Sequence, residues 1–86
     1  MGKRCRHEII AEVLEYLSAV GRARLSKVAL YANMPLDRAR ALLGELQFYG
    51  LVESFVDERG HRYYRASERG FEYLRLWRRL KLLIGY

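Results

Sequence analysis

Apolar residues recur at helical spacing in the first part of the chain, between residues 7 and 20. They are Ile9, Ile10, Val13, Leu14, Leu17 and Val20. This spacing places them on one side of an amphipathic helix, and Glu8, Glu12 and Glu15 then line another side. Gly21 follows directly, and glycine commonly ends a helix. We therefore predict a first helix over residues 7–20, followed by a very short extended stretch over residues 22–25.

The pattern between residues 25 and 52 indicates two short helices separated by a turn. The apolar face of the first is Leu25, Val28, Ala29 and Ala32, and Ser26 is a candidate N-cap through its hydroxyl. Asn33 suits a left-handed position at a helix end, and Pro35 disfavours helical geometry at Met34. The chain therefore turns at these two residues. A second helix begins near Pro35, which gives the arrangement of a helix-turn-helix.

The second of these helices has one apolar side and one side of small and charged residues. The apolar side is Ala39, Leu42, Leu43 and Leu46, and the opposite side is Asp37, Arg40, Ala41, Gly44 and Phe48, flanked by Arg38 and Glu45. Small side chains between arginines let a helix approach another surface closely, and a major groove admits one helix. Gly44 costs about 1 kcal/mol relative to alanine in a helix interior, so close approach is a reason for its presence.

After Gly50 the apolar period changes from that of a helix to the period of two that is typical of strands. Residues 51–56 and 62–66 predict an antiparallel hairpin, and the sequence Asp57-Glu58-Arg59-Gly60 supplies its loop. Because neighbouring strand residues face opposite ways, we expect one of Tyr63 and Tyr64 in the core and the other exposed. Ser67 can then cap a last helix that runs from Glu68 to about Ile84.

This last helix carries more apolar surface than one small domain can bury. Its stripe is Tyr73, Trp77, Leu80 and Ile84, with Leu76 and Leu83 beside it. A second copy that packs its own last helix alongside would cover the stripe, which predicts a homodimer joined through these six residues. The alternative is that the helix folds back over its own domain.

Composition narrows the class of partner. The 86 residues suit a single domain with a thin core, and the net charge is +6. Most of the basic residues are arginine, which binds phosphate and guanine in a bidentate manner, so we expect a polyanion as partner. No stretch approaches the roughly 18 apolar residues of a membrane span, and the basic N-terminus lacks the apolar segment of a signal peptide. We expect a soluble cytoplasmic protein with no membrane partner.

Candidate catalytic and metal-binding residues are few. Cys5, His7 and His61 could form a three-ligand site on paper, but a Cys-x-His pair in a tail lacks the paired spacing of a zinc module. We therefore expect neither an enzyme nor a bound cofactor, metal or small-molecule ligand. The single cysteine excludes an internal disulfide. Residues 1–6 are read as a basic tail that is either solvated or lies along a phosphate backbone.

The run from Ser26 to Gly70 and the residues just after it resemble archaeal winged-helix regulators and chromatin-associated proteins that dimerise through a C-terminal helix. The resemblance lies in YANMPLDRARALLGELQFYGLVE, followed by YYRASERGFEYL. Its specific parts are the YAN turn, the GLVE exit into the first strand and the Y-x-A-S-E-R-G passage into the last helix. The resemblance implies binding of double-stranded DNA as a homodimer, with residues 35–49 as recognition helix and residues 57–62 as wing.

Together these patterns predict a mainly α fold with a small β-hairpin wing, that is, a winged helix-turn-helix with a C-terminal dimerisation helix. The predicted parts are a basic tail over residues 1–6, a winged helix-turn-helix domain over residues 7–66 and a dimerisation helix over residues 67–86. The acidic residues at the wing tip and the short last helix favour a small regulator over an abundant DNA-packaging protein.

The predicted function is that of a sequence-specific transcriptional regulator, nucleoid-associated, with the recognition helix in the major groove. The predicted DNA contacts are Arg24, Ser26, Lys27, Asp37, Arg38, Arg40, Ala41, Gly44, Arg59, His61 and Arg62. Among these, Arg40 is expected at base edges and Arg38 at phosphate. One alternative is a protein-interaction module, which Leu30, Tyr31 and Phe48 would suit. Another is a non-specific, chromatin-type DNA-binding protein.

Overall fold

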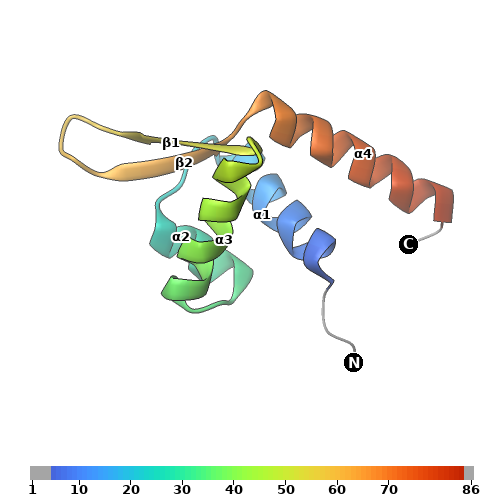
Figure 1. The fold of residues 1–86 in the computed structure, drawn as a ribbon, viewed down its shortest axis with the longest axis horizontal. Helices are drawn as coiled ribbons and strands as arrows, with labels where there is room; N and C mark the ends of the chain where they lie inside the picture. Colours follow the sequence, from blue (N-terminus) through green and yellow to red (C-terminus); the bar gives the residue numbers. More distant parts are fainter. Residues whose placement is uncertain (1–4, 85–86) are drawn as a thin grey trace.

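The computed structural model describes residues 5–84 of the chain as four helices and one hairpin (Figure 1). In chain order these are α1 (Arg6–Val20), α2 (Leu25–Ala32), α3 (Leu36–Phe48), β1 (Val52–Val56), β2 (Arg62–Ala66) and α4 (Glu68–Ile84). The three N-terminal helices pack together, the hairpin extends from them to one side and α4 extends to the other. The structure confirms the predicted mainly α fold with a hairpin wing.

The turn between α2 and α3 has the predicted geometry. Asn33 lies in the left-handed region with a φ of 56°, and the backbone N–H of Met34 donates to the carbonyl oxygen of Ala29. The start of α2 was predicted wrongly, because its N-cap is Arg24 and no side chain caps it. Ser26 lies inside the first turn instead. The reason is that Ala23 pairs with Tyr64, so the backbone is extended up to Arg24 and the helix begins at the next residue.

The hairpin forms from the two predicted segments, and its register places Phe55 opposite Tyr63 and Ser54 opposite Tyr64. Its loop closes through Gly60, which has a φ of 84°. Tyr64 is buried in the core as the alternation predicted, whereas Tyr63, expected to be exposed, is half-buried because Phe55 and Arg22 pack against its ring. The expected short strand over residues 22–25 reduces to the single bridge at Ala23.

The core lies between α1 and the other elements. Its fully buried large side chains are Val13, Leu14, Leu17, Val28, Leu43, Leu46 and Leu74. Val20, predicted in the buried face of α1, is 49% exposed because it is the last residue of the helix, beyond the packed turns. Ala11 is buried although the apolar pattern did not select it. Gly21 ends α1 as expected and donates its N–H to the carbonyl oxygen of Leu17.

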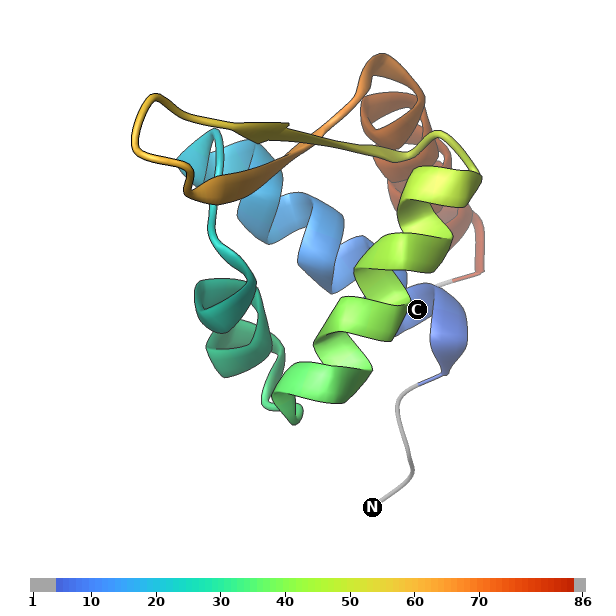
Figure 2. The ribbon, with the colours of Figure 1, turned by 60° about the vertical axis from the view of Figure 1, so that its left-hand side comes forward.

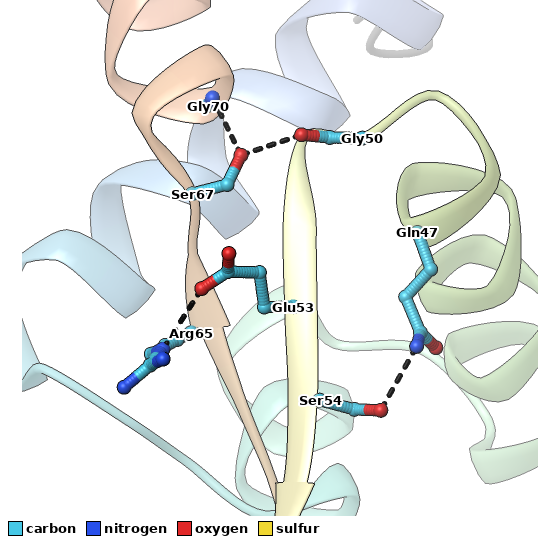
Figure 3. Close-up of polar contacts among 7 residues, drawn as sticks. All are labelled: Gln47, Gly50, Glu53, Ser54, Arg65, Ser67 and Gly70. Atoms are coloured by element: carbon cyan, nitrogen blue, oxygen red, sulfur yellow. Dashed lines mark hydrogen bonds and ion pairs between the residues drawn. The ribbon is translucent and has the colours of Figure 1, made fainter.

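Ser67 joins the hairpin to α4 (Figure 3). Its hydroxyl accepts a hydrogen bond from the backbone N–H of Gly70 at 3.1 Å, which caps the helix as predicted, and donates to the carbonyl oxygen of Gly50. Gly70 is itself buried, and a Cβ there would collide with the carbonyl oxygen of Leu51. The start of α4 is therefore fixed closely against the end of α3 and the start of β1.

The apolar residues of α4 divide into two groups. Leu74 belongs to the core, and Tyr73 and Trp77 are half-buried against it. The other apolar side chains are exposed, namely Phe71, Leu76, Leu80, Leu82, Leu83 and Ile84. One side of α4 thus packs on its own domain as far as Trp77, and the apolar residues after Trp77 are uncovered. None of the helices within residues 5–84 has the length and apolar character that crossing a membrane requires.

Candidate nucleic-acid interface

The outer side of α3 is exposed as predicted. Ala39, Leu43 and Leu46 are buried beneath the helix. The exposed residues of α3 are Leu36, Asp37, Arg38, Arg40, Ala41, Gly44, Glu45, Gln47 and Phe48. A Cβ built on Gly44 meets no atom within 4 Å, so nothing in the described chain requires glycine at that position.

A groove runs between α3, the start of α2 and the wing. It is lined by Arg24, Leu25, Ser26, Leu36, Arg40, Arg62 and Tyr64. Four predicted DNA contacts, Arg24, Ser26, Arg40 and Arg62, thus come together from three separate elements. The lining includes three guanidinium groups and no carboxylate, which makes this groove a candidate binding site for an anion such as phosphate.

A hydrogen-bonded link that the sequence did not reveal connects α3 to the wing. The side-chain amide of Gln47 donates to the hydroxyl oxygen of Ser54 at 2.9 Å (Figure 3). The Nη1 of Arg62 donates to the same oxygen at 3.0 Å. Gln47 lies seven residues after Arg40 and therefore on the same side of α3, which is the one signal in the sequence that could have indicated it.

Arg38 lies on the other flank of α3. It lines a second groove with Arg6, Ile9, Met34, Ala41, Leu42 and Glu45. Within it the guanidinium of Arg6 lies 2.7 Å from a carboxylate oxygen of Glu45, and this hydrogen bond raises the pKa of Arg6. Arg6 is thus the first residue of α1 and not part of a tail as predicted; residues 1–4 of that tail lie outside the described residues.

At the wing tip, Asp57 shapes the loop. One carboxylate oxygen accepts the backbone N–H groups of His61 at 2.8 Å and Arg59 at 2.9 Å, and the other lies 3.8 Å from the His61 ring. These contacts, led by the His61 backbone hydrogen bond, lower the pKa of Asp57. Arg59 lines a separate groove with Arg22 and Phe55, away from the groove that holds Arg62.

Arg22 is a further cation that sequence reasoning missed. Its guanidinium lies 4.3 Å from the centre of the Tyr63 ring, and that ring stacks on Phe55 at 5.8 Å. The guanidinium of Arg65 lies 5.1 Å from the Phe55 ring centre and pairs with Glu53 at 3.0 Å (Figure 3). Cation–π contacts of this kind stiffen the wing. These contacts connect residues that are far apart in the sequence, so no local sequence pattern predicts them.

The hypothetical three-ligand metal site does not form from Cys5, His7 and His61. Cys5 is the N-cap of α1, and the Nδ1 of His7 lies 3.0 Å from the Tyr73 hydroxyl on α4. His61 lies on the wing, beside Asp57. Within residues 5–84, no three histidine, cysteine or acidic side chains group together as metal ligands would.

Figure 2 shows α2, α3 and the hairpin arranged around α1, with α4 behind them. The sequence family described as winged helix-turn-helix matches residues 3–85, almost the whole chain. The chain belongs to the winged helix-turn-helix family. Among curated proteins, none matches this winged helix in sequence.

Solved structures resemble this winged helix in fold. A MarR family transcriptional regulator from Silicibacter pomeroyi superposes with a TM-score of 0.79 and 18% identity, over 90% of this chain and 52% of that one. A Staphylococcus aureus MepR mutant bound to an oligodeoxyribonucleotide gives 0.74 and 14%, over 90% and 62%. A possible transcriptional regulatory protein from Mycobacterium bovis, a fragment, gives 0.69 and 26%, over 91% and 80%. This winged helix spans about half the length of the S. pomeroyi protein.

Proposed function

We propose that this winged helix is a DNA-binding transcriptional regulator that places α3 in the major groove of double-stranded DNA. The observation that carries the proposal is the groove beside α3, where Arg24, Ser26, Arg40 and Arg62 meet without a carboxylate in the lining. A helix flanked by arginines fits a major groove, and the arginines around it suit the phosphates on either side. The net charge of +6 adds long-range attraction.

The similar structures support the same proposal. The MepR mutant that superposes on this chain was solved with an oligodeoxyribonucleotide. The S. pomeroyi protein is described as a transcriptional regulator and the M. bovis protein as a possible transcriptional regulatory protein. Nucleoid association would follow from DNA binding and is part of the proposal. A relationship to archaeal winged-helix regulators is also part of it.

We assign the individual contacts as follows. Arg40 reads a base edge from α3, while Asp37, Ala41 and Gly44 form the surface that approaches the groove. Arg24, Ser26, Lys27 and Arg38 bind phosphates, and Arg59, His61 and Arg62 bind phosphates from the wing. If Arg40 reads a guanine, Arg40→Ala weakens binding by about 1 to 3 kcal/mol and relaxes the preference at one base pair.

The proposal includes a homodimer joined through α4, by Tyr73, Leu76, Trp77, Leu80, Leu83 and Ile84. Leu76, Leu80, Leu83 and Ile84 are exposed and available to a second copy, whereas Tyr73 and Trp77, the latter expected near the centre of the contact, already pack in part on their own domain. A two-fold axis there would present two recognition helices, so the operator would have two half-sites about 10 base pairs apart or a multiple of this. In this proposal residues 67–86 act as the dimerisation part of the chain.

The test is a titration of the protein against duplex DNA at two salt concentrations. Each phosphate neutralised by a lysine or arginine contributes about 0.9 to the slope of log K against log salt, so we expect tight and steeply salt-dependent binding. The rival function is protein interaction through Phe48, Leu30 and Tyr31, which are 85%, 76% and 51% exposed. That rival predicts weak binding to duplex DNA. Selection from random duplexes separates a sequence-specific regulator, which enriches one sequence, from a chromatin-type protein, which enriches none.

A further inference from the structure

The hydroxyl of Ser54 joins the recognition helix to the wing. It stands on β1 and accepts one hydrogen bond from Gln47 of α3 and a second from Arg62 of β2. A hydroxyl oxygen has two lone pairs, so these two donors occupy its full capacity as an acceptor. Arg62, which lines the groove, and Gln47 of α3 are therefore tied to one atom and cannot turn independently while both bonds last.

Both tied side chains keep hydrogen-bonding groups to spare. Within residues 5–84 the carbonyl oxygen of the Gln47 side chain and its second N–H make no further hydrogen bond. Arg62 uses one of its five N–H donors on Ser54, and its guanidinium makes no other hydrogen bond to the described residues. Ser54 thus fixes two groups whose remaining donors and acceptors are free for a ligand.

The free groups match two parts of a DNA duplex. A side-chain amide presents an acceptor and a donor side by side, which complements the N6 amino group and N7 of adenine in the major groove. The guanidinium of Arg62 suits a phosphate oxygen. Gln47 lies on the same side of α3 as Arg40, so an amide that reads a base would extend the row of contacts that Arg40 begins.

We propose that Gln47 reads an adenine and that Ser54 is the positioning residue that holds Gln47 for this task while it aims Arg62 at the backbone. The inference rests on the proposed function, since it names a base that the proposed interface recognises. Exposed hydrogen bonds add little to folding stability, so the role of this link lies in recognition.

The experiment begins with the duplex that the unmodified protein selects from a random pool. Each adenine of that duplex is replaced in turn by 7-deazaadenine, which lacks the N7 acceptor. At one adenine in each half-site, we expect binding by the unmodified protein to weaken by about 2- to 12-fold, the value of one hydrogen bond. Gln47→Ala and Ser54→Ala should each bind the selected duplex and its 7-deazaadenine version equally well. The first variant lacks the side-chain amide, and the second lacks the hydroxyl that positions it.

Two control variants separate positioning from general damage. Ser54→Thr keeps the hydroxyl on the strand and should discriminate against 7-deazaadenine as the unmodified protein does. Ser18→Ala removes an exposed serine of α1, remote from this link, and should also leave discrimination intact. Thermal melting of each variant confirms that it folds.

Three results would overturn the inference while DNA binding stands: no adenine of the selected duplex responds, Gln47→Ala still discriminates, or Ser54→Ala discriminates fully. Failure of the unmodified protein to bind any duplex is a different result. It would overturn the proposed function itself, and the inference with it.

Discussion

Within residues 5–84, two glycines lie inside helices, and their surroundings are opposite. A Cβ on Gly44 of α3 meets empty space, whereas a Cβ on Gly70 of α4 meets the carbonyl oxygen of Leu51 and, at 3.2 Å, a methyl group of Leu14. Glycine costs about 1 kcal/mol relative to alanine in a helix interior, which is where Gly44 lies, whereas Gly70 lies in the first turn of α4. Packing within the domain accounts for Gly70, and it does not account for Gly44.

Gly44→Ala should therefore stabilise the fold and weaken DNA binding at once. The gain is about 0.5 to 1 kcal/mol from helix propensity, and the loss arises because the added methyl group holds α3 away from the groove. Urea unfolding and a duplex titration on the same preparation measure the two effects. An alanine variant that binds DNA with unchanged affinity would exclude close approach as the reason for this glycine.

Gly70→Ala should instead lower the free energy of unfolding. The backbone of Leu51 cannot move aside without disturbing the start of β1, so we expect a loss of about 1 to 3 kcal/mol in spite of the better helix propensity. Urea unfolding checks this, with Gly44→Ala as the matched control. Equal stability of the two variants would mean that the junction between α4 and the sheet is looser than its geometry indicates.

At the scale of elements, the wing depends on one ionised carboxylate. The backbone hydrogen bonds from His61 and Arg59 to Asp57 lower its pKa below its ordinary value of 3.8. Because the folded-state pKa is the lower one, the resulting stabilisation is fully present above the unfolded value and is lost as the pH falls through the folded value.

Asp57→Asn should accordingly lower the melting temperature at neutral pH, since an amide oxygen is a weaker acceptor than a carboxylate. The gap between the melting temperatures of variant and unmodified protein should shrink below about pH 4, as Asp57 of the unmodified protein becomes protonated. Melting curves across this range test it. A gap that persists undiminished at the lowest pH would show that the charge of Asp57 is unimportant to the loop.

Element boundaries could be predicted from the sequence where local residues determine them. Gly21, Asn33 and Ser67 act on the backbone within a few residues of themselves, and each ends or starts a helix as expected. The start of α2 could not be predicted in this way. It depends on the pairing of Ala23 with Tyr64, residues that are distant in sequence.

The candidate site shows the same division. Periodicity alone indicated the outer side of α3, because helical spacing is a local property. The link from Gln47 through Ser54 to Arg62 and the stacking of Arg22 on Tyr63 require three elements to be placed in space first. The assignment of each cation to DNA remains a prediction.

At the scale of the whole molecule, the division of α4 decides how dimerisation should be tested. Trp77 packs on its own domain, so replacing it would damage the monomer as well as any contact between copies. Leu80 and Leu83 are exposed, and charge there perturbs the fold little. They are the better probes of association.

The double variant Leu80→Glu, Leu83→Glu should be a folded monomer that binds DNA far more weakly than the loss of one contact would explain, because two linked half-sites bind together. Sedimentation and duplex titration measure the two effects. Val20→Glu, which places a charge at another exposed apolar position, is the control and should remain dimeric. An unmodified protein that sediments as a monomer at tens of micromolar would remove the dimer from the proposal.

The contact between α1 and α4 also bears on when the domain folds during synthesis. Synthesis delivers α1 first among the described elements and α4 last, yet Leu74 of α4 completes the core that Leu14 and Leu17 of α1 begin. A nascent chain halted before Leu74 therefore leaves these leucines incompletely covered, whatever else has formed. We therefore expect this domain to complete its core only after its final helix has been synthesised.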